Sequence, residues 1–218
     1  MQIRKEKNKK GLNKSQLIVV GSLLILLGIC VVGSKYVYNY FLDKEEDVKI
    51  EEFYQEQEKI DINVIEETPE IEEQEVKQES KENYIAVIKI PKIGVEKGLC
   101  RKGSYCNNVN QNIQILNEAD YPDVAKGNFI LAGHSGSGRV AYFKNVYKLE
   151  IDDSISIVYG GFEYKYKIVN IYDVEKTGSA NIIRNKEKNT LTLVTCRHNT
   201  NKQIIVISEL VERSEYNG

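Results

Sequence analysis

The longest uncharged stretch of the chain lies near its N-terminus. Residues 17–34 carry no charged side chain, and they begin with the apolar run LIVVGSLLILLGICVV. A helix that spans a bilayer needs about 20 mainly apolar residues, so this stretch predicts a transmembrane helix. Tyr36, Tyr38 and Tyr40 follow it and suit the membrane interface, where amphipathic rings settle. A cleaved signal peptide is the alternative, although its apolar core would be only about 7–15 residues long.

Beyond residue 83 the pattern changes to short apolar runs in which buried and exposed positions alternate. Such runs are typical of strands. They cover residues 84–90, 129–132, 154–159, 162–172, 190–195 and 204–210. Gly160 and Gly161 separate two of them and predict a hairpin turn. The best short helix candidate is 140–149, so the domain is predicted to be mainly β, as a barrel or a sandwich.

Charge divides the chain further. Residues 1–16 carry six Lys or Arg side chains against one Glu, whereas residues 43–82 carry 17 acidic and 5 basic side chains. The acidic segment has few apolar residues and is predicted to be a solvated spacer. Basic residues before an apolar helix favour a cytoplasmic N-terminus, which places the rest of the chain outside the membrane. No zone has the layout of a nucleic-acid-binding surface.

The predicted organisation therefore has four parts. They are a cytoplasmic basic N-terminus (1–16), a transmembrane anchor (17–34), an acidic extracellular spacer (35–82) and a folded domain (83–218).

Two residues at the ends of predicted strands could carry chemistry. His134 follows one strand in LAGHSGSG, and Cys196 ends another in TLTLVTC. A cysteine nucleophile reacts as its thiolate, which a nearby imidazolium or other cation stabilises, so this combination points to acyl transfer. Each residue alone has a simpler interpretation, because a lone cysteine at a strand end is usually a small buried side chain.

Cys100 and Cys106 lie close together in a predicted loop, CRKGSYC. Their spacing permits a disulfide, and free thiols are the alternative. With Cys30 in the apolar stretch and Cys196 apart from the others, the cysteines are too sparse for a disulfide scaffold.

Several segments together resemble the sortase family across about residues 84–211. They are IPKIGV (90–95), GNFILAGHSG (127–136), YFKNVYKLEIDDSISI (142–157) and TLTLVTC (190–196). LAGHS is similar to the histidine motif of the family, and the last segment is similar to its TLxTC nucleophile motif. The resemblance implies a mainly β fold, an eight-stranded sortase-type β-barrel with short helices, here preceded by one transmembrane helix.

The resemblance also implies a reaction. A sortase cleaves an LPxTG-like sorting signal on a surface protein between Thr and Gly and passes the acyl group to an amine on a peptidoglycan precursor or a pilin subunit. Cys196 would be the nucleophile and His134 the acid/base partner, and no metal or organic cofactor is required. The expected location is the cell membrane, single-pass, with the catalytic domain extracellular.

One position departs from the family pattern. Sortases normally carry an arginine at the start of the strand after the cysteine, and the matching position here is Gln203, next to Lys202. Arg197 beside the nucleophile is the named candidate for the oxyanion and substrate stabiliser, and the amide of Gln203 is the other. Because neighbouring residues of a strand face opposite sides, the choice between them stays open. His198 is predicted to be a loop histidine.

Two other functions remain in view, a non-catalytic anchored binding module on a sortase barrel and a thiol peptidase that hydrolyses without transfer. The segment before the cysteine strand is short, and the acidic spacer lacks an Asp-Pro-aromatic lid motif. Both features favour a housekeeping or class-D-like subtype.

Overall fold

The structure is a computed structural model that describes residues 13–60, 84–178 and 180–217. It divides into two compact units, Met1–Lys44 and Glu45–Gly218. The predicted cytoplasmic segment 1–12 and residues 61–83 of the predicted spacer lie outside the described residues.

Helix α1, Lys14–Ile60, contains the predicted transmembrane stretch. It is long and apolar enough to cross a membrane, with a mean hydropathy of 2.7 in its most apolar window and none of that window buried. The helix does not end at residue 34 as the predicted anchor does. Its continuation is rich in Glu and Lys, which are good helix formers, and Lys49 pairs with Glu45 one turn earlier.

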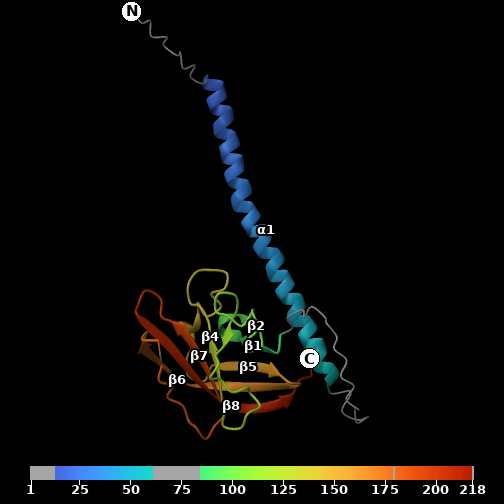
Figure 1. Cartoon of the computed structure of the whole chain (residues 1–218), viewed down its shortest axis with the longest axis vertical. Helices are drawn as coiled ribbons and strands as arrows, with labels where there is room; N and C mark the ends of the chain where they lie inside the picture. Colours follow the sequence, from blue (N-terminus) through green and yellow to red (C-terminus); the bar gives the residue numbers. More distant parts are fainter. Residues whose placement is uncertain (1–12, 61–83, 179, 218) are drawn as a thin grey trace, which may run out of the picture. The chain divides into compact units, whose positions relative to one another are not determined.

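The second unit is built around a single eight-stranded sheet that curls into a nearly closed barrel (Figure 1). Its strands are β1 (Ala86–Ile90), β2 (Val95–Leu99), β3 (Gln114–Ile115), β4 (Asn128–Ala132), β5 (Ser154–Tyr159), β6 (Phe162–Glu175), β7 (Thr190–Cys196) and β8 (Lys202–Glu215). They pair in the order β2-β1-β5-β6-β8-β7-β4-β3. Two 3₁₀ turns, η1 (Pro91–Ile93) and η2 (Val146–Lys148), complete the elements. The predicted mainly β barrel is confirmed.

The core lies inside the barrel and is built by alternation along the strands. On β7 the fully buried Leu191 and Leu193 point inward, as do Ile204 and Val206 on β8. The intervening residues of β7, ending at Cys196, therefore face outward. The nucleophile candidate thus stands on the outer face of the sheet, at the end of a strand whose other face is anchored in the core.

The six predicted strands are present, and the turn at Gly160 and Gly161 joins β5 to β6, with φ of 59° and 80°. These left-handed values explain two consecutive glycines. The predicted helix over 140–149 is wrong. The segment instead makes bonds between residues three apart, from the N–H of Lys144 to the carbonyl of Ala141 and from the N–H of Val146 to the carbonyl of Phe143, and only η2 forms there. The short strands β2 and β3 had not been predicted from the apolar pattern.

The last part of α1, Glu45–Ile60, belongs to the same unit as the barrel. Ile50 and Phe53, three residues apart on one helical face, are buried against Val87 of β1 and Val158 of β5. Within residues 45–57, Ile50, Phe53 and Gln57 are therefore buried, whereas a solvated spacer had been predicted across 35–82. The apolar residues there are few, but helical spacing gathers them on one face.

Candidate active site

The two predicted catalytic residues follow neighbouring strands. β4 and β7 pair in parallel, with Ala132 opposite Val194. His134 and Cys196 each lie two residues further on, at the same end of the pair. Parallel strands are about 4.8 Å apart, so this register brings the two positions side by side.

Backbone contacts extend this pairing as far as the two residues. The N–H of Gly133 donates to the carbonyl of Val194 at 3.2 Å, and the hydroxyl of Thr195 donates to the carbonyl of Gly133 at 2.7 Å. Thr195 is buried, so its hydroxyl needs such a partner. The residue before each candidate is thus tied to the other strand.

The imidazole of His134 has a partner that sequence reasoning missed. Its Nε2 lies 3.2 Å from Oδ1 of Asn110. Asn110 belongs to the segment before β3, where Oδ1 of Asn108 accepts from the Asn110 N–H at 2.9 Å. A side chain that holds one ring nitrogen of a histidine fixes the orientation of the ring. The run NNVNQN at 107–112 was the available signal, but its spacing alone did not point to His134.

Cys196 is a free, half-buried cysteine, and the residue directly opposite it on β8 is Gln203. Side chains of directly opposed residues lie on the same face of a sheet, with their Cβ atoms about 4.5–5.5 Å apart. The side chain of Gln203 therefore leaves the sheet next to that of Cys196, on the outer face.

The guanidinium of Arg197 is bound to a carboxylate. Its Nε and Nη2 donate to Oδ1 of Asp173 on β6, at 2.9 and 2.8 Å. Lys202 is exposed, and its Nζ lies 3.9 Å from Oε1 of Glu175. Of the three candidates for the missing arginine, Gln203 is the one whose backbone position is paired with the cysteine.

Two hollows lie beside Cys196 and Gln203, and each of these residues lines one of them. The first has a volume of about 570 Å³ and is lined by Ser135, Gly136, Ser137, Phe143, Lys144, Asn145, Tyr147, Thr195, Cys196, Arg197, His198 and Ile204. The predicted loop histidine His198 is thus on its wall. The second has about 820 Å³ and is lined by Leu116, Glu118, Ile130, Lys176, Gly178, Ala180, Ile182, Val194, Asn201 and Gln203. Cys196 thus lines the first hollow, and Gln203 lines the second. The second hollow contains five apolar side chains.

Cys100 and Cys106 form a disulfide, which resolves the alternative left open by their spacing. The bridge closes the loop that precedes Asn107, whose buried side chain donates to the carbonyl of Ile115 and accepts from its N–H. The segment that carries Asn110 is therefore fixed both at the disulfide and at β3.

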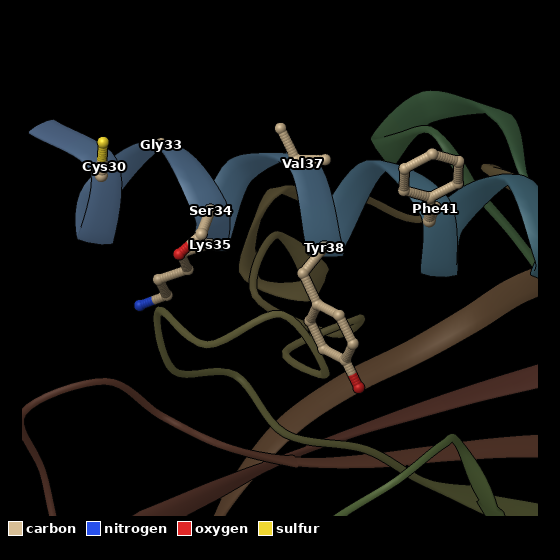
Figure 2. Close-up of a pocket in the computed structure, with 7 residues that line it drawn as sticks. All are labelled: Cys30, Gly33, Ser34, Lys35, Val37, Tyr38 and Phe41. Atoms are coloured by element: carbon tan, nitrogen blue, oxygen red, sulfur yellow. The ribbon is translucent and has the colours of Figure 1, made fainter.

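A further hollow lies on α1 (Figure 2). All of its lining residues come from this one helix, and they are Cys30, Gly33, Ser34, Lys35, Val37, Tyr38 and Phe41. Gly33 has no side chain, which leaves a shallow space between its neighbours. Because a single exposed helix forms it, we assign this hollow no part in the active site.

Comparisons with known proteins agree with the geometry. The family model of the sortase domain matches residues 88–211. Sortase A of Staphylococcus aureus is 26% identical over 183 residues, which are 82% of this chain and 84% of that protein. Sortase D of Bacillus subtilis is 28% identical over 110 residues, half of this chain and 52% of that protein.

Solved structures give the same result. A Clostridium perfringens Sortase D5 transpeptidase is 30% identical with a TM-score of 0.51, covering 60% of this chain and 80% of that one. Sortase A from Corynebacterium diphtheriae, at 22% identity and a TM-score of 0.54, shares the fold over 62% of this chain and 63% of its own. Since the family model covers more than half of the sequence, the chain belongs to the sortase family of cysteine transpeptidases.

Proposed function

We propose that this sortase cleaves an LPxTG-like sorting signal through a thioester on Cys196 and transfers the surface protein to an amine of the cell wall or of a pilin. The observation that carries the proposal is the parallel register of β4 and β7, which places His134 and Cys196 at one end of adjacent strands. The apolar hollow beside Gln203 supports it, because it suits the leucine and proline of such a signal.

In the first half-reaction the thiolate sulfur of Cys196 attacks the carbonyl carbon of the signal threonine. A C–S bond forms and the Thr–Gly amide bond breaks. The departing glycine nitrogen takes a proton from the imidazolium of His134, which becomes neutral. Asn110 is the group in the structure that orients the ring for this transfer.

In the second half-reaction the acceptor amine attacks the thioester. Neutral His134 takes a proton from that amine, an amide bond forms, and the sulfur of Cys196 leaves as thiolate. The enzyme returns to its starting charge state. Cys196 lines the first hollow and not the apolar hollow beside Gln203. The first hollow is therefore the proposed route by which the acceptor amine enters.

Gln203 is the proposed donor to the developing oxyanion, in place of the arginine that sortases normally carry. It stands opposite Cys196, whereas the guanidinium of Arg197 is engaged by Asp173. A neutral amide donates a hydrogen bond without supplying a full charge, so we expect weaker stabilisation than an arginine gives.

We also propose a single-pass topology with a cytoplasmic N-terminus. Six basic side chains precede the apolar stretch of α1, and cytoplasmic flanks of membrane helices are enriched in Lys and Arg. The catalytic unit would then face the outside, where sorting signals and acceptor amines are found. The proposed partners are surface proteins that bear sorting signals and a peptidoglycan or pilin amine.

The test uses the full chain in detergent and a quenched LPxTG-like peptide, with and without an amine acceptor. We expect cleavage that an amine accelerates and diverts into a transpeptidation product. Cys196→Ala should abolish both, and Cys30→Ala, at the other free cysteine, should leave both unchanged. Cleavage without any effect of the amine would indicate a thiol peptidase, and no cleavage by the wild-type chain would indicate a binding module.

A further inference from the structure

The loop that follows β4 and carries His134 contains three glycines, at 133, 136 and 138. Glycine has no Cβ and loses more conformational freedom on folding than any other residue, so such a loop needs contacts to hold one shape. Its start is tied to β7 through Gly133, and the carbonyl of His134 accepts from the N–H of Phe143 at 3.0 Å. Between these ties, residues 136–139 are exposed.

The helical segment 45–57 packs on the outer face of the barrel, within the same unit. Phe53 is 4% exposed and lies against Val87 and Val158, both fully buried. Further along, Oε1 of Gln57 accepts from the N–H of Gly161 at 2.6 Å. The helix is therefore anchored to the β5–β6 turn at one end and to the β1 and β5 surface in its middle.

At the other end of this segment, the carboxylate of Glu46 joins three side chains. Its Oε2 lies 2.7 Å from Nζ of Lys97 on β2 and 3.8 Å from Nη1 of Arg139. Its Oε1 accepts from the hydroxyl of Tyr142 at 3.0 Å. Arg139 and Tyr142 belong to the loop of His134, so one carboxylate connects the helix, β2 and that loop.

Glu46 supplies the negative charge that Lys97 and Arg139 share in this cluster. Its side chain is only 15% exposed, and Lys97 also lies over the ring of Tyr142, with Nζ 4.8 Å from the centroid. Burial and the Glu46 carboxylate raise the pKa of Tyr142, which keeps its hydroxyl a donor at neutral pH. Without the carboxylate, Lys97 and Arg139 would lose the negative charge that they share, which is unfavourable in a half-buried site.

We propose that Glu46 is a positioning residue, which holds the loop of His134 through Arg139 and Tyr142 and so sets where the imidazole meets the substrate. Glu46 does not touch the reacting atoms. The contact between Glu46 and Tyr142 reaches His134 through one neighbouring residue. Phe143 follows Tyr142 in the chain and donates its backbone N–H to the carbonyl of His134. This inference rests on the proposed function, since it requires His134 to transfer protons.

The primary test compares Glu46→Gln with Glu45→Gln in the full chain. Both changes remove one negative charge from the same helix turn, but Glu45 is exposed and pairs along the helix surface with Lys49, at 2.9 Å. Displacing a catalytic group by about 1 Å can lower a rate about a hundredfold, so we expect Glu46→Gln to reduce kcat about tenfold. KM for the sorting peptide should stay within about twofold, because the hollow beside Gln203 is unchanged.

A second pair of variants separates positioning from helix attachment. Tyr142→Phe removes only the hydroxyl that Glu46 accepts from, and should reproduce the kcat defect without adding to it in the double variant. The exchange Glu46→Lys with Lys97→Glu restores the ion pair between helix and β2, but leaves an ammonium against Arg139 and Tyr142. We expect its thermal midpoint to recover while kcat stays low.

Two results would overturn the proposal. One is a Glu46→Gln variant whose kcat equals that of Glu45→Gln, and the other is a charge exchange that restores kcat together with the thermal midpoint. Hydrogen exchange of the amides at 134–142 should become several times faster in Glu46→Gln but not in Glu45→Gln. That readout needs no turnover, so it tests Glu46 even if the wild-type chain fails to cleave the peptide.

Discussion

At the scale of single residues, an amide stands opposite the proposed nucleophile, where the resemblance to sortases leads us to expect an arginine. Gln203 is paired with Cys196 across β7 and β8, while the nearby guanidinium of Arg197 is bound to Asp173. An amide can donate a hydrogen bond to an oxyanion, but it adds no positive charge. A substitution at position 203 can therefore raise the catalytic rate as well as lower it.

Substituting Gln203 should move the rate in both directions. Gln203→Ala removes the amide donor, and loss of one oxyanion donor lowers kcat by about a hundredfold or more. Gln203→Arg supplies a charged donor and should raise kcat/KM above that of the wild-type chain. Single-turnover cleavage of the quenched peptide measures both. A Gln203→Ala enzyme with unchanged kcat would show that another group stabilises the oxyanion.

Asn110 is the residue that holds the imidazole. Asn110→Ala removes the acceptor at 3.2 Å from Nε2 of His134 and leaves the ring free to rotate. We expect kcat to fall about tenfold with little change in KM, since only orientation is lost. Asn170→Ala, on the exposed part of β6, is the control and should match the wild-type chain. Equal rates for the two variants would contradict an orienting role.

At the scale of elements, the approach of the Phe143 ring to the backbone of Gly133 supports the position of His134. A Cβ added at Gly133 would lie 2.7 Å from the Phe143 ring, closer than such atoms approach. Phe143 also donates its backbone N–H to the His134 carbonyl. A side chain at 133 therefore has to displace the segment that fixes the histidine.

Gly133→Ala is expected to reduce both activity and stability. Overpacking of this kind costs about 1–3 kcal/mol, and the shift of Phe143 should lower kcat as well. Gly138→Ala is the matched control in the same loop, because a Cβ there meets nothing within 4 Å. Urea unfolding and peptide cleavage on both variants make the comparison. A Gly133→Ala protein as active as Gly138→Ala would show that the ring gives way without moving His134.

The packed end of α1 can be tested in the same manner. Phe53→Ala leaves a space between the helix and the fully buried Val87 and Val158, and truncation of a buried phenylalanine costs about 3 kcal/mol or more. Val48→Ala removes an exposed side chain from the same helix and should change the free energy of unfolding by less than about 0.5 kcal/mol. Similar losses in the two variants would mean that the helix contributes nothing to the barrel.

At the scale of the whole molecule, the compact unit that contains the barrel extends from Glu45, whereas the predicted catalytic domain begins at residue 83. A fragment that starts at residue 84 would expose the outer face of β1 and β5, where Val87 and Val158 are buried by the helix. We expect it to aggregate more readily and to unfold at a lower temperature than a fragment that starts at residue 45. Light scattering and thermal unfolding of the two fragments test this. Equal behaviour would restore the boundary at 83.

Much of this architecture could be predicted from the sequence, for identifiable reasons. Alternation revealed β5 and β6, a β-branched run revealed β7, and two glycines revealed the hairpin, because these signals are local. β3 has two residues and no readable period. The Asn110–His134 contact joins positions 24 residues apart, and the Cys196–Gln203 pairing depends on register. Docking of residues 45–57 depends on a face of β1 and β5 that no local pattern describes.

The parallel pairing of β4 and β7 also has a consequence for when the enzyme becomes active. The bond between Thr195 and Gly133 closes 62 residues of chain, and β7 is held on its other side by β8, the last strand. Contacts between distant segments form slowly, because the entropy of closing the chain is lost before they form. Until β4 and β7 pair, His134 and Cys196 are both present in the chain but are not held at the same end of neighbouring strands. The arrangement that we propose for catalysis therefore exists only once β4 and β7 have paired, so we expect the thiol to cleave a sorting signal only after this part of the chain has folded.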